Sequence, residues 1–335
     1  MSTVEEETFY IVCPPPPVTT TTTTTVGYVF AGYSVRPGRV DKISPSTMTL
    51  VKTFTAPSGH NDVYALTSLS GYVFAGYFTL PALVDKINPS TMSLVKTFTA
   101  PSGHNDVWSL TSLSGYIFVG LPISPGYVDK ISPSTMTLVK TFTPPLGYYN
   151  AISLTTLSGY VYVGYSTSPG RVDKINPSTM SLVKTFTAPS GHYAVYSLTS
   201  LSGHLFAGYH TSPGRVDKIS PSTMTLVKTF TAPSGHNYVY GLTSLSGYLF
   251  AGYGTSPGRI DKISPSTMSL VKTFTAPTNH NLVMVLTSLS GYLFAGYSTV
   301  PGYVDKISPS TMTLVKTFTA PSGHNYVRAL TTLAT

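Results

Sequence analysis

A Gly-Tyr pair recurs along this chain at a fixed spacing of 44 residues, and this period constrains the fold more than any other feature. The pair, once replaced by Gly-His, begins at residues 27, 71, 115, 159, 203, 247 and 291, with no insertion between copies. A unit this short cannot bury its own apolar residues, so neighbouring copies must cover one another. We therefore expect seven packed copies of one structural unit over residues 27–335.

Each copy contains four strand-like runs separated by turn residues. The copy at Gly247 reads GYLFAGYGTSPGRIDKISPSTMSLVKTFTAPTNHNLVMVLTSLS. Its β-branched and aromatic runs are typical of strands, and the Pro, Gly, Ser and Asn between them are typical of tight turns. The predicted strands of this copy are Tyr248–Tyr253, Arg259–Ile263, Ser269–Thr275 and Leu282–Leu289.

Four short antiparallel strands in a period of about 40 to 45 residues are typical of a propeller blade. Rings of roughly four to eight such blades close on themselves. We therefore predict an all-β protein, a seven-bladed β-propeller of 44-residue, four-stranded blades.

The segments VYSLTSLSG, YLFAGY, RVDKI, PST and SLVKTF follow one another in an order that resembles the YVTN-type propellers of prokaryotic surface proteins. In those proteins an inner strand ends in a Gly turn, and an element of the form V-x-x-I-x-P-x-T follows. The resemblance implies that inner strand A ends each 44-residue unit and that strands B, C and D open the next. The C-terminal strand A, Val327–Leu333, would then join strands B, C and D of residues 28–56 and close the ring.

The formal charge of +8 comes mostly from residues that recur in every copy. An Asp-Lys pair and a further lysine return every 44 residues, from Asp41-Lys42 and Lys52 onward. Charges spread around a ring do not form the basic cluster that specific nucleic-acid binding needs. We expect no specific nucleic-acid partner, and we expect each repeated Asp to pair with the adjacent Lys.

The sequence shows neither a membrane span nor a disulfide framework. It has no apolar run of about 18 residues or more, and its single cysteine, Cys13, has no internal partner. The first residues, MSTVEEE, are acidic, unlike a secretory signal.

The seven copies differ from one another in a pattern. The turns from A to B and from C to D are nearly constant, whereas the loops from B to C and from D to A carry most of the substitutions. In an up-and-down blade these two pairs lie on opposite faces of the disc. One face should therefore be uniform and the other individual to each blade.

Candidate ligand-binding residues lie where strand A begins on the variable face. Residues two apart on a strand share a side, so the entrance position and the position two residues on should form one aromatic collar around the channel. The candidates are Asp62, Tyr64, Asp106, Trp108, Tyr196, Tyr238, Tyr240, Met284, Tyr326 and Arg328. Aromatic planes suit sugar rings or extended peptides, and Trp, Tyr and Arg are enriched in binding hot spots. Neutral variation of tolerant loops is the alternative.

Neither a metal site nor a catalytic site stands out. A histidine precedes strand A in six copies and is replaced by Tyr148 in one. Because the six come from different blades, one metal ion could not gather them, and we expect structural histidines that bond their own loops. We expect no cofactor and no enzyme; a propeller lyase or hydrolase using Asp62 and Asp106 is the runner-up.

Residues 1–26 differ in composition from the repeats. The run Phe9, Tyr10, Ile11, Val12 and Cys13 has strand propensity, and four prolines and the threonines Thr19, Thr20, Thr21, Thr22, Thr23, Thr24 and Thr25 follow it. Thr-rich tracts beside Pro are typical of O-glycosylated stalks. The run could dock as a strand on a neighbouring copy and give a head-to-tail filament; folding back onto its own ring, or disorder, is the alternative.

These observations favour an extracellular or cell-surface structural or adhesive subunit. It would self-associate through its N-terminal strand and contact glycans or surface proteins through the variable face. A monomeric lectin-like binding module is the alternative.

Overall fold

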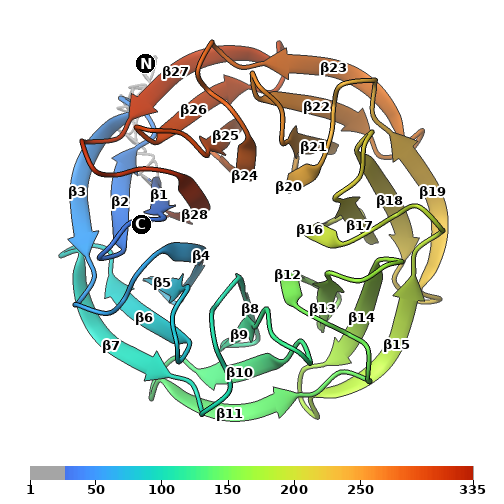
Figure 1. The fold of residues 1–335 in the computed structure, drawn as a ribbon. Coiled ribbons are helices and arrows are strands. Elements are labelled where there is room, and N and C mark those ends of the chain that lie inside the picture. Colours follow the sequence, from blue (N-terminus) through green and yellow to red (C-terminus); the bar gives the residue numbers. More distant parts are fainter. Residues whose placement is uncertain (1–26, 335) are drawn as a thin grey trace, which may run out of the picture.

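The computed structural model describes residues 27–334, which form seven four-stranded antiparallel sheets and no helix. The sheets stand around a central channel in sequence order, like the blades of a propeller (Figure 1). The predicted all-β, seven-bladed ring is confirmed. The strand-like run Phe9–Cys13 and the threonines Thr19–Thr25 lie outside the described residues.

Each blade has strands A to D, counted from the channel outward. Strands A are β28 (Val327–Ala334), β4 (Val63–Leu69), β8 (Ser109–Leu113), β12 (Ala151–Leu157), β16 (Val195–Leu201), β20 (Val239–Leu245) and β24 (Val283–Leu289). Strands B are β1 (Gly27–Tyr33), β5 (Tyr72–Tyr77), β9 (Tyr116–Gly120), β13 (Tyr160–Tyr165), β17 (His204–Tyr209), β21 (Tyr248–Tyr253) and β25 (Tyr292–Tyr297).

Strands C are β2 (Arg39–Ser44), β6 (Leu83–Asn88), β10 (Val128–Ser132), β14 (Arg171–Asn176), β18 (Arg215–Ser220), β22 (Arg259–Ser264) and β26 (Tyr303–Ser308). Strands D are β3 (Thr49–Thr55), β7 (Ser93–Thr99), β11 (Thr137–Phe142), β15 (Ser181–Thr187), β19 (Thr225–Thr231), β23 (Ser269–Thr275) and β27 (Thr313–Thr319). Blade 1 consists of β28, β1, β2 and β3, and blades 2 to 7 follow from β4 onward.

Blade 1 joins the two ends of the described chain. β28 pairs with β1 in antiparallel register, from Gly27 opposite Ala334 to Tyr33 opposite Val327. The inner strand of the first blade is thus β28, and the closure that the resemblance to YVTN-type propellers implied is confirmed.

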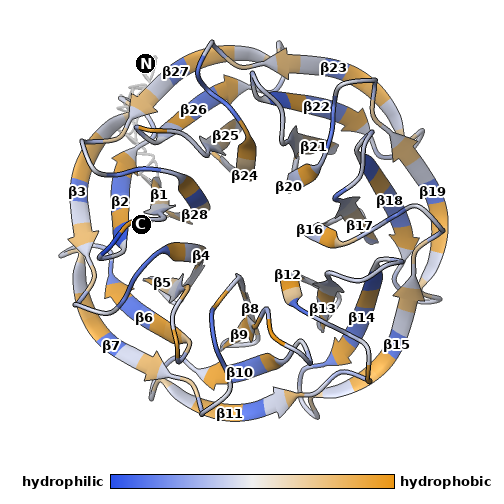
Figure 2. Cartoon of the chain, in the orientation of Figure 1, coloured by the Kyte–Doolittle hydropathy of each residue, from blue (hydrophilic) through white to orange (hydrophobic). Residues whose placement is uncertain are grey.

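The hydrophobic core lies between neighbouring blades. In β5, Val73 and Ala75 pack with Phe30 and Val40 of blade 1, whereas Phe74 packs towards blade 3. Alternate residues of one strand therefore cover opposite neighbours, and hydrophobic residues recur at matching places around the ring (Figure 2). A single repeat has no core of its own, as expected for stacked repeats.

Glycine in strand B permits the close approach of the next blade. A Cβ on Gly32 would lie 2.5 Å from Cγ1 of Val63, the first residue of β4. Any side chain there would push the two blades apart.

The buried Asp of strand C is a hydrogen-bond centre in each blade. In blade 2, Asp85 accepts hydrogen bonds from Thr97 at 2.6 Å, from Tyr77 at 2.9 Å and from Nδ1 of His60 at 2.9 Å. The expected Asp-Lys pairing is wrong, because successive strand residues point to opposite sides. The six histidines are structural, but their rings bond this carboxylate and not their own loops.

The lysine next to each Asp connects its blade to the following one. Nζ of Lys86 donates to the carbonyl oxygen of Pro133 at 3.0 Å and lies 4.0 Å from the centre of the Tyr72 ring. The same bond recurs in all seven blades and ends with Lys306 on Pro45. Each C-to-D turn therefore accepts a neighbour's lysine at the carbonyl oxygen of its proline.

Within residues 27–334, no helix is long and apolar enough to cross a membrane.

Candidate functional site

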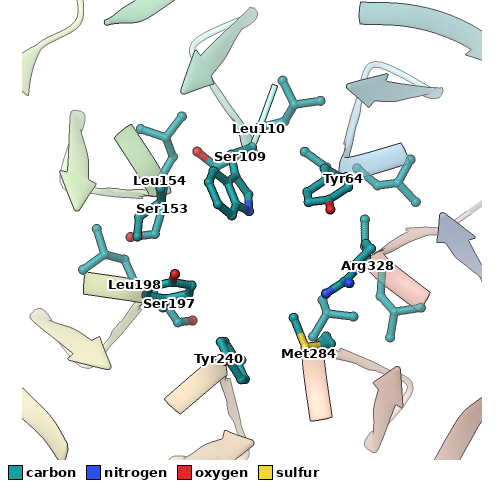
Figure 3. Close-up of a pocket in the computed structure, with 18 residues that line it drawn as sticks. Tyr64, Ser109, Leu110, Ser153, Leu154, Ser197, Leu198, Tyr240, Met284 and Arg328 are labelled. Atoms are coloured by element: carbon teal, nitrogen blue, oxygen red, sulfur yellow. The ribbon is translucent and has the colours of Figure 1, made fainter. Parts of the chain in front are cut away.

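The mouth of the central channel is a pocket of about 370 Å³. Equivalent positions of all seven blades, each 44 residues from the next, surround it (Figure 3). These residues are Tyr64, Trp108, Ile152, Tyr196, Tyr240, Met284 and Arg328. The sequence singled out six of them as candidates, and the structure brings the six together at one site.

A bulge at the start of strand A aims these side chains at the channel. In blade 2 the register shifts between Val63 and Ala65, so Tyr64 has no partner on β5. The same shift occurs in blades 4 to 7, whereas β8 begins only after Trp108. A bulge typically redirects a side chain next to a functional site.

Aromatic rings form a continuous arc along one side of the pocket. The ring centres of Tyr64 and Trp108 are 6.0 Å apart, and those of Tyr196 and Tyr240 are 5.4 Å apart. Trp108 also lies 6.4 Å from Tyr196, two blades away, across the buried and non-aromatic Ile152. The edges and faces of this arc can pack against a flat or ring-shaped ligand.

Of the described residues, Arg328 is the only charged one that lines the pocket. Its guanidinium carbon lies 5.5 Å from the centre of the Tyr64 ring, and its Nε has no hydrogen-bond partner among residues 27–334. Burial raises the pKa of Tyr240, and the positive charge of Arg328 acts in the opposite direction. The pocket is thus partly apolar and positively charged.

Three serines add polar groups below the arc. Ser153 donates to the carbonyl oxygen of Val195 at 2.7 Å, and Ser197 accepts from the amide of Leu242 at 2.8 Å. The buried hydroxyl of Ser109 has no hydrogen-bond partner within residues 27–334. Ser109 therefore differs from Ser153 and Ser197 in having a buried hydroxyl that is not hydrogen-bonded within this range.

The residues at the entrance to strand A do not line this pocket. All seven have left-handed backbone, with φ between 41° and 59°. Their side chains therefore do not share a side with the residue two positions on, and the expected single collar divides into two sets.

The second set lies in the loops around the pocket. Asp62 accepts hydrogen bonds from Oγ of Ser34 at 2.8 Å and from Nε of Arg36 at 3.0 Å. Tyr238 stacks on His210 with ring centres 4.3 Å apart, and Tyr326 is exposed.

Two aromatic residues near the pocket were not among the sequence candidates. Phe78 stacks on Tyr64 with ring centres 5.0 Å apart, and His210 stacks on Tyr196 at 4.9 Å. Nε2 of His210 lies 3.2 Å from the hydroxyl of Tyr240, and burial lowers the pKa of this histidine. Both follow strand B directly, a position that holds Ser, Phe, Pro, Ser, His, Gly and Ser in the seven copies. That variation was the signal that could have identified them.

A second hollow of about 340 Å³ lies beside the first, where the loops of blades 1, 2 and 3 meet. It is lined by Arg36, Gly59, Asn61, Phe78, Thr79, Leu80 and Asp106. Burial raises the pKa of Asp106 above its usual value. Phe78 belongs to this hollow and also stacks on Tyr64 of the channel mouth, so the two hollows adjoin.

Comparisons with known proteins show the fold alone. The chain is similar to the crystal structure of the computationally designed Ika8 protein, with a TM-score of 0.63 and 13% identity over 90% of this chain and 86% of that one. It is also similar to hydrazine synthase of Kuenenia stuttgartiensis, with a TM-score of 0.64 and 11% identity over 74% of this chain and 77% of that one. No protein-family model and no curated protein matches the chain, so the relation to YVTN-type propellers stays a resemblance.

The lining of the pocket combines several kinds of side chain. Among residues 27–334 it offers aromatic rings, aliphatic side chains, serine hydroxyls and one guanidinium group, but no carboxylate, thiol or imidazole. In the described part of the chain, no three His, Cys, Asp or Glu side chains are grouped to hold a metal ion. Stacking, hydrogen bonding and the attraction of one anionic group are what this arrangement can do.

Proposed function

We propose that this protein is a non-enzymatic structural or adhesive subunit of the cell exterior that binds a glycan at the mouth of its channel. The observation that carries the proposal is the ring of seven equivalent positions around one pocket. They hold an aromatic arc and a single arginine where a repeat protein would by default carry seven identical residues. Concave sites with aromatic walls and a few polar groups are typical of ligand binding.

The proposed location outside the cell rests on composition. The prolines and threonines of residues 14–25 are typical of O-glycosylated stalks. The resemblance to surface-protein propellers supports the same location.

A glycan array probed with the full chain tests the binding proposal. We expect binding to a subset of glycans, and we expect Trp108→Ile to weaken it at least tenfold because the stacking surface is lost. Ile stands at the equivalent position 152, so the variant keeps a side chain that the fold already accepts.

Tyr193→Asn is the matched control, because it removes an exposed aromatic ring outside the pocket and Asn237 stands at the equivalent position. An array without any bound glycan, or equal losses in the two variants, would contradict the proposal.

Assembly into filaments is a second proposed property, and the outer edges of the blades favour it. Each sheet ends at a strand D, such as β3 or β7, whose outer edge pairs with no strand among residues 27–334. An extended segment of another copy can add to such an edge by main-chain hydrogen bonds. The proposed segment is Phe9–Cys13.

Electron microscopy of the full chain beside a chain that begins at Val26 tests assembly. We expect filaments of the full chain and single rings of the shorter one. Single rings in both samples would contradict assembly and leave a monomeric lectin-like module.

A further inference from the structure

We propose that the ligand is an elongated oligosaccharide with one terminal carboxylate, which lies from Arg328 across Tyr64 and Phe78 into the second hollow. This inference rests on the proposed glycan binding and adds the charge, the length and the direction of the ligand.

The path is a series of contacts that runs outward from the channel. Arg328 lies 5.5 Å from the Tyr64 ring centre, and Tyr64 stacks on Phe78 at 5.0 Å with an angle of 29° between the rings. Phe78 in turn lines the second hollow beside Leu80. These side chains form a continuous surface that joins two hollows of about 370 and 340 Å³. A single sugar would occupy one hollow, whereas a short chain of sugars can use both.

The inner end of the path selects for an anion. Among residues 27–334, Arg328 is the only charged residue that lines the channel mouth. Its Nε is buried and has no hydrogen-bond partner in that range. A guanidinium group binds a carboxylate through two parallel hydrogen bonds, and no acidic side chain of the described lining competes for it.

The outer end selects against a second anion. Nε of Arg36 lies 3.0 Å from Oδ2 of Asp62, so the positive charge of Arg36 is balanced by this carboxylate. Asp106 therefore contributes the remaining charge of the hollow. The carboxylate of Asp106 can accept hydrogen bonds from sugar hydroxyls but repels another carboxylate. Asn61 adds amide donors and acceptors, and Leu80, 74% exposed, offers an apolar surface to a sugar ring.

The path exists on one side of the ring only. The position of Phe78 is Ser166 in blade 4, and the position of Leu80 is Ser168. Because the large apolar pair occurs in blade 2, an oligosaccharide bound at Arg328 can extend in one direction.

Three tetrasaccharides test this inference through the fluorescence of Trp108, which is the only tryptophan of the chain and lies in the pocket. The probes are xylotriose with one terminal glucuronic acid, neutral xylotetraose and fully acidic tetragalacturonate. We expect the first to bind at least tenfold more tightly than either of the others. Calorimetry on the same samples checks that the fluorescence signal reports binding.

Three variants, each carrying a residue found at an equivalent position of another blade, separate the two ends of the path. Arg328→Met removes the positive charge and should abolish the preference for the glucuronic-acid probe over xylotetraose. Met was chosen because Met284 is the equivalent residue of blade 7. Asp106→Asn should raise the affinity for tetragalacturonate severalfold while changing that for the first probe less than about threefold. Phe78→Ser should lower the affinity for the first probe severalfold.

Val300→Ser is the control, because Val300 is exposed at the position equivalent to Leu80 but borders neither hollow. Equal binding of the three probes, or an unchanged preference in Arg328→Met, would overturn the inference while leaving glycan binding intact. The absence of binding by all three would also overturn it, and the array would then show separately whether the chain binds another glycan.

Discussion

Among single residues, the buried aspartate of strand C shows how one substitution changes a repeated hydrogen-bond network. Six blades supply a histidine to this carboxylate, as His192 does to Asp217 at 2.9 Å. Blade 4 has Tyr148 in that place, where the ring lies 4.5 Å from the guanidinium carbon of Arg171. Burial raises the pKa of Asp173 to about 6, although hydrogen bonds from Thr185 and Tyr165 act to lower it.

This raised pKa makes the free energy of unfolding depend on pH. The folded chain holds the Asp173 proton up to a pH of about 6, whereas the usual value is 3.8. The protonated carboxyl therefore contributes to the free energy of unfolding below pH ~4, and this contribution is lost as the pH rises through about 6.

Replacing Tyr148 by His should restore the missing partner. We expect Tyr148→His to raise the free energy of unfolding by about 1–3 kcal/mol at pH 7, because the imidazole donates a hydrogen bond to a carboxylate that is otherwise costly to bury. At pH 4 the gain should be smaller. Urea unfolding of both proteins at the two pH values measures this gain. An equal gain at pH 4 and pH 7 would contradict the link between the missing histidine and the raised pKa of Asp173.

Between strands of neighbouring blades, the repeated lysine provides a second kind of connection. Nζ of Lys262 on β22 donates to the carbonyl oxygen of Pro309 at 3.0 Å and lies 3.9 Å from the centre of the Tyr248 ring. The bond crosses from blade 6 to blade 7, so it adds to the packing that keeps the blades in register.

Removing this ammonium group should weaken the interface between the two blades. We expect Lys262→Met to lower the free energy of unfolding by about 1–2 kcal/mol, from the lost hydrogen bond and cation–π contact. Lys272→Met on the exposed face of β23 is the control and should change stability by less than about 0.5 kcal/mol. Equal effects of the two variants in urea unfolding would show that the bond to Pro309 contributes nothing.

For the ring as a whole, closure depends on β28. This strand is the inner strand of blade 1 and also contacts the strands A of blades 2 and 7. Without it, β1 would expose an unpaired edge to the channel, and open sheet edges promote association between chains.

Deleting residues 327–335 should therefore destabilise the ring and not merely shorten it. We expect a fall in melting temperature of roughly 10 °C or more, with aggregation, because the ring loses its closing strand and Val327 and Leu330 leave a core cluster. Calorimetry and size-exclusion chromatography measure this, with a chain that lacks only Thr335 as the control. A monomer with an unchanged melting temperature would show that the ring does not depend on closure.

The strands could be read from residues within one repeat, and the number of blades from the number of repeats along the chain. Alternating apolar residues and turn residues act over a few positions, and the predicted Tyr248–Tyr253 and Ser269–Thr275 coincide with β21 and β23. The strand order that the resemblance implied then left Val327–Leu333 with one place to pair.

The composition of the pocket and the partners of the buried charges depend on distances between blades, which no local pattern contains. Trp108 lies near Tyr196 although a whole blade separates them in sequence, and Asp106 does not line the channel mouth because its backbone is left-handed, with a φ of 56°. Asp85 bonds His60 in place of Lys86 because the strand turns alternate side chains to opposite blades. The repeat thus specifies the ring through local periodicity, whereas the site arises from side chains far apart in sequence that the closed ring brings together.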